Sequence, residues 1–247
     1  MNTFKKINLL GVGFTEADKD KILEYITRSL VYGAKKSYIV TPNPELLVMA
    51  DKDVEYKKVL NEAELALPDG IGVILASKIL GKHLKQRIPG VDLVENLCRH
   101  VAKQPITVGF LGSKPGVAVK VGECLQKRYP GLKVKLVASE WNETLKHTSV
   151  DILFVAFGSP KQEFWISKNL NTLPVKIAIG VGGAFDFISG KVPRAPVLMR
   201  RLGLEWLFRL LVQPWRIKRQ ISLIHFGWLV FREKLGGLFV NIGQQQQ

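Results

Sequence analysis

Short apolar runs alternate with amphipathic segments between residues 7 and 180 of this chain. The apolar runs are rich in β-branched and aromatic residues, which is typical of strands. Two segments, Leu153–Phe157 and Ile177–Ile179, are apolar at every position, as expected for strands that are buried on both faces. The predicted strands are Ile7–Val12, Ser37–Thr41, Leu65–Leu67, Ile106–Leu111, Leu132–Ala138, Ile152–Phe157 and Val175–Gly180.

Helical patterns lie between these strands. One helix is expected to open at Thr15, and another at Pro44, because proline is tolerated at the first helical position. Further helices are predicted at Val91–Val101, Val117–Arg128 and Gln162–Leu170. This alternation predicts an α/β fold, with a Rossmann-like, mostly parallel sheet and helices on both of its faces.

The pattern changes after Gly190, where a proline-containing segment is followed by purely helical patterns. We therefore predict an α/β core at residues 1–193 and a basic, amphipathic helical appendage at residues 194–247. Pro214 is expected to split the appendage into two helices. The apolar run Ile221–Phe231 is too short to span a bilayer and is typical of an interfacial helix. The final Gln244–Gln247 is predicted to be disordered.

Composition indicates a folded protein. The chain has 247 residues, of which 47% are hydrophobic and 23% charged, and this predicts one sizeable core. Cys98 and Cys124 lie in helical patterns and are interpreted as small apolar residues in a reducing compartment. Because the amino terminus has no signal-peptide pattern, a cytoplasmic location is expected.

Positive charge is concentrated toward the carboxyl end. Residues 194–234 contain nine Lys or Arg and two acids, so they carry +7 of the net charge of +15. Three of the five Trp lie in the same segment, and this mixture indicates a membrane surface, a nucleic acid or a phosphorylated ligand. Arg209, Arg216 and Arg219 could present guanidinium groups to phosphate on a shared helix face, although Pro214 interrupts that helix. A solvated charged face is the alternative.

Asp69 is the main catalytic candidate. It follows a predicted strand and lies between Pro68 and Gly70, so its carboxylate is expected on a rigid strand-to-helix corner. Thr41 and Asn43 follow the preceding predicted strand in the same way. The carboxyl ends of strands in an open α/β sheet line one crevice. There a carboxylate can act as general base toward a sugar hydroxyl, whereas a simple turn role for Asp69 is the alternative.

Two glycine-containing loops are candidate nucleotide sites near the starts of helices. Gly11–Gly13 lacks the third glycine of the dinucleotide fingerprint, so a tight turn is preferred to NAD binding. The loop Gly109–Gly116, which includes Gly112 and Ser113, ends a strand and opens a helix. Backbone N–H groups at such a helix start can hold a phosphate or ribose, although a plain turn is equally consistent with the sequence.

A third loop begins at Gly158, after the most apolar strand, and leads to Gln162 and Glu163 in the first turn of a predicted helix. Two interpretations remain open for this turn. Gln162 faces the crevice in one of them. In the other, the turn serves only the helix, through the favourable charge of Glu163 near its amino terminus.

No metal site is predicted. Asp51 and Asp53 have the spacing of the metal-binding acid pair of sugar-nucleotide enzymes, but they fall in a helical pattern. Residues two positions apart on a helix point about 200° apart, so a solvated helix face is the preferred interpretation. The sequence also lacks a His, Cys or acid cluster with metal-ligand spacing.

Five loop segments, taken in order, resemble the WecG/TagA/CpsF glycosyltransferases. The resemblance covers roughly residues 7–220, and five ordered segments are more specific than any one motif. The segments are Thr41-Pro42-Asn43, Pro68-Asp69-Gly70, Gly158–Glu163, Gly180–Asp186, and Arg194-Ala195-Pro196 through Gly203–Leu210.

The resemblance implies an inverting glycosyltransferase that uses neither a metal nor another cofactor. Such an enzyme transfers a sugar, most typically N-acetylmannosamine or a related hexose or uronic acid, from a UDP-sugar. The acceptor is a polyprenyl-diphosphate-linked sugar at the inner face of the cytoplasmic membrane, and the product serves cell-surface polysaccharide synthesis. A docking role on the membrane is implied for the appendage, and no nucleic acid partner is expected.

The resemblance also implies roles for individual residues. Asp69 would be the general base, and positive side chains would meet the diphosphate, since fixed cations can replace a metal. Sugar contacts are expected from Thr41 and Asn43, with Arg87 and Gln162 nearby, and diphosphate contacts from Arg209, Arg216 and Arg219. Nucleotide contacts from Gly112, Ser113 and Gly158 are a separate expectation that comes from the glycine-containing loops and not from the resemblance.

Two departures from the family pattern affect these expectations. The segment between Ala138 and Asp151 is shorter than in relatives, which puts its nucleotide contacts in doubt. Gln213 replaces a common Glu, and the chain continues beyond Arg219 with an apolar run. A nicotinamide-dependent oxidoreductase and a non-enzymatic binder of membrane or nucleic acid are the rival functions. The sequence leaves the oligomeric state open, including a homo-oligomer.

Overall fold

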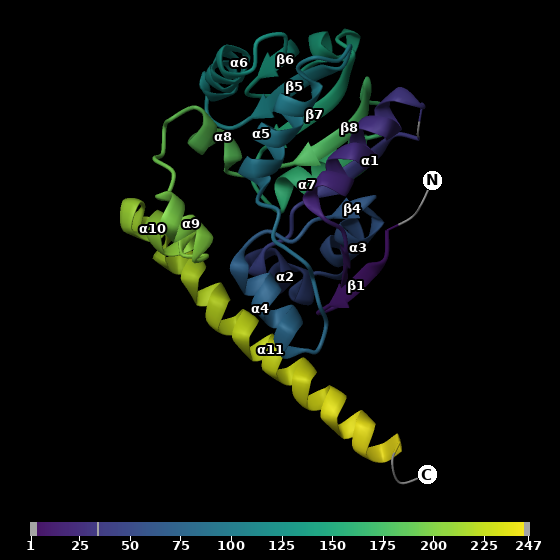
Figure 1. Ribbon diagram of the computed structural model, residues 1–247, viewed down its shortest axis with the longest axis vertical. Helices are drawn as coiled ribbons and strands as arrows, with labels where there is room; N and C mark the ends of the chain where they lie inside the picture. Colours follow the sequence, from purple (N-terminus) through teal and green to yellow (C-terminus); the bar gives the residue numbers. More distant parts are fainter. Residues whose placement is uncertain (1–3, 34, 245–247) are drawn as a thin grey trace.

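The computed structural model describes residues 4–33 and 35–244, with backbone only at 216, 218–220 and 237–244. A six-stranded parallel sheet with the order β4-β3-β8-β7-β5-β6 forms the centre of the molecule (Figure 1). The predicted α/β fold is therefore confirmed. The strands are β3 (Ser37–Val40), β4 (Leu65–Ala66), β5 (Thr107–Gly112), β6 (Lys133–Ala138), β7 (Val150–Ala156) and β8 (Val175–Gly180).

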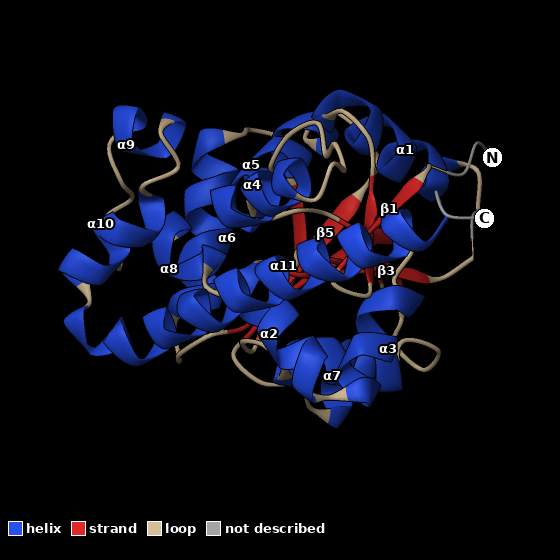
Figure 2. Cartoon of the chain, turned by 90° about the horizontal axis from the view of Figure 1, so that it is seen from below, coloured by secondary structure: helices blue, strands red, loops and turns tan. Residues whose placement is uncertain are grey.

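Helices cover both faces of this sheet, as Figure 2 shows. Alternate residues of β7 enter different clusters: Ile152 and Phe154 on one face, and Leu153 and Val155 on the other. This double burial explains why the strand is apolar throughout. One layer contains α1 (Lys19–Val31), α5 (Gly90–Val101) and α6 (Val117–Arg128); the other contains α2 (Pro44–Lys52), α3 (Val54–Glu62), α4 (Ile71–Ile79) and α7 (Lys161–Asn169).

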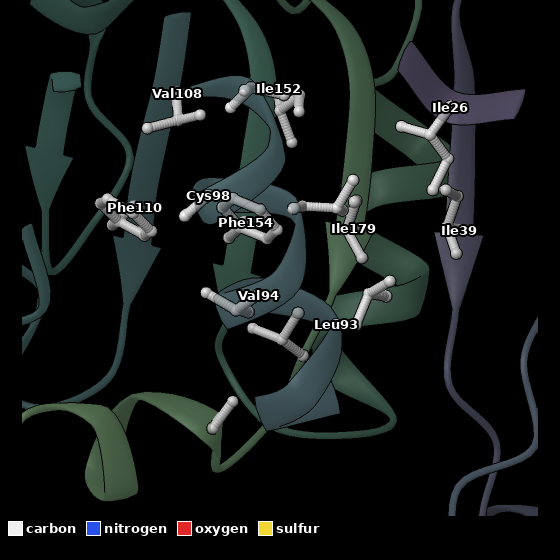
Figure 3. Packing of buried hydrophobic residues seen from close by; sticks show 14 of the residues in the cluster. Ile26, Ile39, Leu93, Val94, Cys98, Val108, Phe110, Ile152, Phe154 and Ile179 are labelled. Atoms are coloured by element: carbon white, nitrogen blue, oxygen red, sulfur yellow. The ribbon is translucent and has the colours of Figure 1, made fainter. Parts of the chain in front are cut away.

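Helix α5 shows how the first layer packs. Its buried residues Leu93, Val94 and Cys98 lie over the side chains of β5, β7 and β8 (Figure 3). Phe110 of β5 stacks on Phe154 of β7, with ring centroids 5.5 Å apart. Cys98 is buried as predicted, Cys124 is half-buried, and both are free thiols.

The predicted first strand is wrong. Instead of one strand in the main sheet, residues 6–15 form a separate antiparallel hairpin of β1 (Lys6–Leu9) and β2 (Val12–Thr15). Leu10 and Gly11 make its two-residue turn with positive φ angles of 54° and 80°, as the favoured hairpin turns require. The backbone N–H of Leu10 donates to Glu233 at 3.1 Å, so a distant part of the chain supports this unusual leucine.

Four helical segments follow β8 and a short α8 (Ala184–Ile188): α9 (Val197–Arg201), α10 (Glu205–Val212), the 3₁₀ segment η2 (Pro214–Arg216) and α11 (Ile217–Gln244). The expected break at Pro214 is confirmed. Helix α11 packs against α2 and α4 (Figure 1), and it buries Phe226, Leu229 and Val230 in the core. Within the described residues, no helix has both the length and the apolar character needed to cross a membrane. Residues 245–247 of the expected disordered end lie outside the described residues.

Polar contacts also hold α11 on the core, and they correct the interpretation of Asp51 and Asp53. Helix α2 ends at Lys52, and Asp53 caps α3 by accepting a 3.0 Å hydrogen bond from the backbone N–H of Tyr56. Asp51 does not lie on a solvated face, because Arg232 of α11 pairs with it at 3.0 Å. The two carboxylates thus have separate structural roles.

We predict that Leu229→Ala destabilises the whole α/β core, because this side chain is 1% exposed and belongs to the cluster beneath α11. The free energy of unfolding, measured by urea denaturation, should fall by about 2–5 kcal/mol. Ile224→Ala on the same helix is the matched control, since Ile224 is 77% exposed, and it should change stability little. Equal effects of the two substitutions would contradict the integration of α11 into the core.

Candidate active site

A cleft of about 670 Å³ opens at the carboxyl ends of β3, β4, β5, β7 and β8. Residues of α4, α10 and α11 also line it, together with the first turns of α2, α5, α7 and α8. This volume lies in the usual range for a small-molecule site, and its position is the one expected for an open α/β sheet. The sequence-predicted residues that line it are Thr41, Asn43, Asp69, Arg87, Ser113, Gly158, Gln162 and Arg209.

Three predicted residues fall outside this set. Gly112 does not line the cleft; it has a φ of 109°, and a Cβ there would lie 2.8 Å from the carbonyl carbon of Ala156. Gly112 therefore permits the close approach of β5 and β7 and positions Ser113 behind it. The side chains of Arg216 and Arg219 lie outside the described residues.

Asp69 is held at the corner between β4 and α4. Its backbone N–H donates to the carbonyl of Pro42 at 3.0 Å, which joins the loops that follow β3 and β4. Gly70 then turns the chain into α4 with a φ of 93°, a conformation that favours glycine. The Asp69 carboxylate accepts a 3.4 Å hydrogen bond from the backbone N–H of Gly90 at the start of α5. The Asp69 main chain is thus held by the loop after β3, and its carboxylate by the start of α5.

Burial raises the pKa of Asp69 to about 6. The Gly90 N–H and the Arg87 guanidinium oppose that rise in pKa. The nearby negative charge of Glu205 adds to it. A carboxyl with this pKa is mostly ionised at neutral pH, but it accepts a proton far more readily than an exposed aspartate. These are the electrostatic properties of a general base.

Arg87 connects this corner to the helices that cover it. Its guanidinium donates to the backbone carbonyl of Arg200 and pairs with Glu205 at 3.7 Å. Arg194 bridges Glu205 at 3.3 Å and Asp92 at 2.5 Å. The sequence interpretation did not assign a role to Glu205, although it lies in the fifth resembling segment. One of its partners, Arg87, is more than 100 residues away, and nothing in the sequence pairs it with the nearer Arg194.

Thr41 and Asn43 line the cleft and also stabilise it. The Thr41 hydroxyl donates to the Gly180 carbonyl at 3.1 Å, which links the ends of the paired strands β3 and β8. The Asn43 side chain caps α2 by accepting from the backbone N–H of Leu46 at 3.1 Å. Both side chains therefore hydrogen-bond to the backbone and also present polar groups to the cleft.

Gln162 and Glu163 are buried and form one network below the cleft. The Gln162 amide donates to Glu163 at 2.6 Å, while its oxygen accepts from the backbone N–H of Gly182 at 3.0 Å. Glu163 also accepts from Ser159 at 2.8 Å and Tyr56 at 3.2 Å. Burial raises the pKa of Glu163, and these hydrogen bonds oppose the rise. Glu163 is more than a helix-terminal charge, because it sets which way the Gln162 amide points.

Arg209 of α10 lies in the cleft wall, against the loop between β8 and α8. A Cβ on Gly183 would lie 2.6 Å from the Arg209 guanidinium, so this group lies directly against the Gly183 backbone and a larger residue there would displace it. Arg209 stacks over Phe187, 4.6 Å from the ring centroid, and approaches Asp186 at 3.9 Å. The Ser113 hydroxyl donates to the same Asp186 at 3.4 Å, so the predicted nucleotide loop and diphosphate arginine share one wall.

The structure also places the Gly11–Gly13 loop, the short segment 139–150 and the possible metal ligands. Gly11 lies in the hairpin turn and not between a strand and a helix, so the dinucleotide-fingerprint interpretation is wrong. The short segment 139–150 forms a 3₁₀ turn, η1 (Glu143–His147), and none of its residues lines the cleft. Among the described residues, no group of three or more His, Cys, Asp or Glu side chains could hold a metal ion.

Comparison with known proteins identifies a family and relatives for this chain. A sequence model described as the glycosyl transferase WecG/TagA/CpsF family matches residues 7–238. Relatives from Bacillus spizizenii and Bacillus subtilis are 34% and 32% identical, covering 89% and 91% of this chain and 87% and 90% of theirs. A relative from Staphylococcus aureus is 32% identical and covers 93% of both chains. All three are named N-acetylglucosaminyldiphosphoundecaprenol N-acetyl-beta-D-mannosaminyltransferase.

The family match includes the strands, the cleft loops and most of the covering helices, which confirms the resemblance found in the five segments. An oxidoreductase and a non-enzymatic binder are therefore set aside. The chain belongs to the glycosyl transferase WecG/TagA/CpsF family and is a hexosyltransferase.

Proposed function

We propose that this enzyme transfers N-acetylmannosamine, or a closely related hexose, from a UDP-sugar to a polyprenyl-diphosphate-linked sugar with inversion and without a metal ion. The names of its relatives support a polyprenyl-diphosphate sugar as acceptor and N-acetylmannosamine as the sugar moved. The observation that carries the proposal is the half-buried Asp69 carboxylate at the convergence of the cleft loops.

Asp69 would act as the general base of a single displacement. Its carboxylate takes the proton from the acceptor hydroxyl as that oxygen attacks the anomeric carbon of the donor sugar. The bond from that carbon to the diphosphate breaks on the opposite face, and UDP departs with the electron pair. One displacement of this kind inverts the anomeric centre.

Arg209 would stabilise the departing diphosphate. Its guanidinium sits against the Gly183 backbone in the cleft wall, close to the loop that contains Ser113. Preorganised cations at the site of developing negative charge are a major source of catalysis, and arginine matches phosphate oxygens well. Contacts from Arg216 and Arg219 remain predictions from the resemblance.

The helices after β8 would dock the enzyme on the cytoplasmic face of the membrane. Large apolar side chains in this part are exposed, including Leu198, Trp215, Ile221 and Ile224. The surrounding segment is basic, and exposed apolar groups combined with positive charge favour an anionic lipid surface. Peripheral attachment would place the cleft near a membrane-anchored acceptor.

We predict that Asp69→Asn lowers kcat by about 10²- to 10⁴-fold, the range for loss of a general base, while UDP-sugar still binds. In the wild type, kcat/KM should rise with pH through about 6 and then level off, because the ionised carboxylate is the active form. The variant should lack this limb. Rates measured by mass spectrometry of the product, with binding measured by calorimetry, test both parts. Full activity of the variant would remove Asp69 from the mechanism.

The stability of Asp69→Asn separates loss of the base from loss of the fold. Because the folded-state pKa is raised, the contribution of Asp69 to stability is present below its ordinary pKa and is lost as pH rises through about 6. Asparagine cannot ionise, so the melting temperature of the variant at pH 7.5 should equal or exceed that of the wild type. Asp20→Asn, at an exposed position on α1, is the matched control and should leave activity unchanged.

We predict that saturating EDTA leaves the transfer rate unchanged, because the positive charge that faces UDP comes from arginine side chains. The measurement compares initial rates in metal-free buffer with rates after addition of magnesium or manganese. A loss of activity in EDTA that manganese restores would show that a metal takes part.

We predict that Glu163→Gln lowers kcat/KM for the donor by about tenfold or more. A carboxylate accepts the bonds from Tyr56, Ser159 and Gln162 together, whereas an amide has only one acceptor oxygen and leaves a buried donor unpaired. The Gln162 amide would lose its orientation toward Gly182. Tyr56→Phe removes one of these bonds and should have a smaller effect. Unchanged donor kinetics in Glu163→Gln would mean that the network does not orient the loop.

A further inference from the structure

The cleft has a second wall with a different chemistry from the one that contains Arg209 and Ser113. Three helices supply this second wall, which we call the apolar wall. Its members are Ile71 and Leu75 of α4, Trp206 of α10, and Leu223 and Phe226 of α11. No sequence motif pointed to this set, because its members come from segments up to 155 residues apart.

Glycines allow the backbones around the apolar wall to pack closely. A Cβ on Gly203 would lie 2.6 Å from Cβ of Ile71, and one on Gly72 would lie 2.8 Å from Cγ of Pro44. The loop before α10 therefore sits directly on the first turn of α4. These contacts pack the loop before α10 and the start of α2 against the first turn of α4, beside Ile71 of the apolar wall.

The apolar wall continues from the interior of the cleft to the outside of the protein. Phe226 is buried, while Leu75 is 50% exposed, and Ile79, one turn further along α4, is also exposed. Residues four apart lie on the same face of a helix, so Ile71, Leu75 and Ile79 form a stripe about 12 Å long. The stripe begins directly after Asp69 and Gly70 and leads away from them.

We propose that the apolar wall and the α4 stripe bind the first isoprene units of the acceptor lipid. This inference rests on the proposed function, in which the acceptor is an amphiphile with a sugar, a diphosphate and a branched apolar chain. Its sugar hydroxyl must reach Asp69, so the chain needs an apolar exit that starts beside this carboxylate. The apolar wall offers that exit, and its continuity with the catalytic corner favours the substrate's own chain over a bilayer lipid or a second protein copy.

Soluble acceptors test this assignment without any membrane. N-acetylglucosamine diphosphate esters that carry either an ethyl or a farnesyl chain are compared below their aggregation concentrations, with no vesicles or detergent. In the wild type, kcat/KM should be at least about tenfold higher for the farnesyl ester, since each buried isoprene unit removes several CH₂-sized groups from water. Leu75→Ser should reduce this ratio severalfold. Val119→Ser, which changes a similarly exposed residue on α6, should retain it.

The possible outcomes distinguish failure of the isoprenoid subsite from failure of the proposed transferase function. Equal use of both esters by the wild type, or an unchanged ratio in Leu75→Ser, would overturn the isoprenoid subsite while leaving the transferase proposal intact. A chain preference that arises only when vesicles are added would also overturn it, because the α4 stripe would then contact the bilayer. Transfer to neither ester would contradict the acceptor class itself and the subsite with it.

Discussion

The partial removal of Asp69 from water is the constraint on which the cleft depends. A carboxylate loses hydration energy when it is buried, and donors or positive charges must compensate for that loss. Gly90 provides one donor and Arg87 a positive charge, but the acidic Glu205 counteracts part of this help. The resulting pKa of about 6 keeps the carboxylate ionised at neutral pH and still basic enough to take a proton.

The helices that follow β8 take part in this balance. Arg87 contacts both Glu205 and the backbone carbonyl of Arg200. Its guanidinium therefore joins the loop near Asp69 to helices α9 and α10. If α9 and α10 moved away, water would reach Asp69 and the negative charge of Glu205 would leave. Both changes would lower its pKa toward that of an ordinary aspartate. Closure of the cleft and the strength of the base are therefore physically coupled.

The sequence was sufficient for those features that depend on local pattern. The central strands β5, β7 and β8 could be predicted because burial on both faces requires nearly continuous apolar runs, whereas the edge strand β6 alternates apolar and polar residues. The order of the strands along the chain places Asp69, Thr41 and Gln162 at the carboxyl end of the sheet. The hairpin could not be predicted, because its turn contains Leu10 with a positive φ that contact with Glu233 of α11 supports.

The network around Glu163 was missed for a related reason. A glutamate in the first turn of a helix has an adequate local explanation, and its hydrogen bond to Tyr56 joins residues 107 positions apart. Arg194 likewise pairs with Asp92, 102 positions away, as well as with the nearby Glu205. Residue type alone does not reveal such partners, because any of several arginines could satisfy any of several acids.

The two walls of the cleft suggest how one carboxylate can serve two very different substrates. The nucleotide part of the proposed UDP-sugar donor is strongly anionic, and it suits the side where Arg209 and Ser113 meet the loop after β8. The acceptor brings an apolar chain, which suits the side formed by α4 and α11. Asp69 lies where these sides meet, since it follows β4 and precedes the first turn of α4. In the proposed reaction a base in this position lies between the two ligands, and it would reach the acceptor hydroxyl when each ligand occupies its own wall.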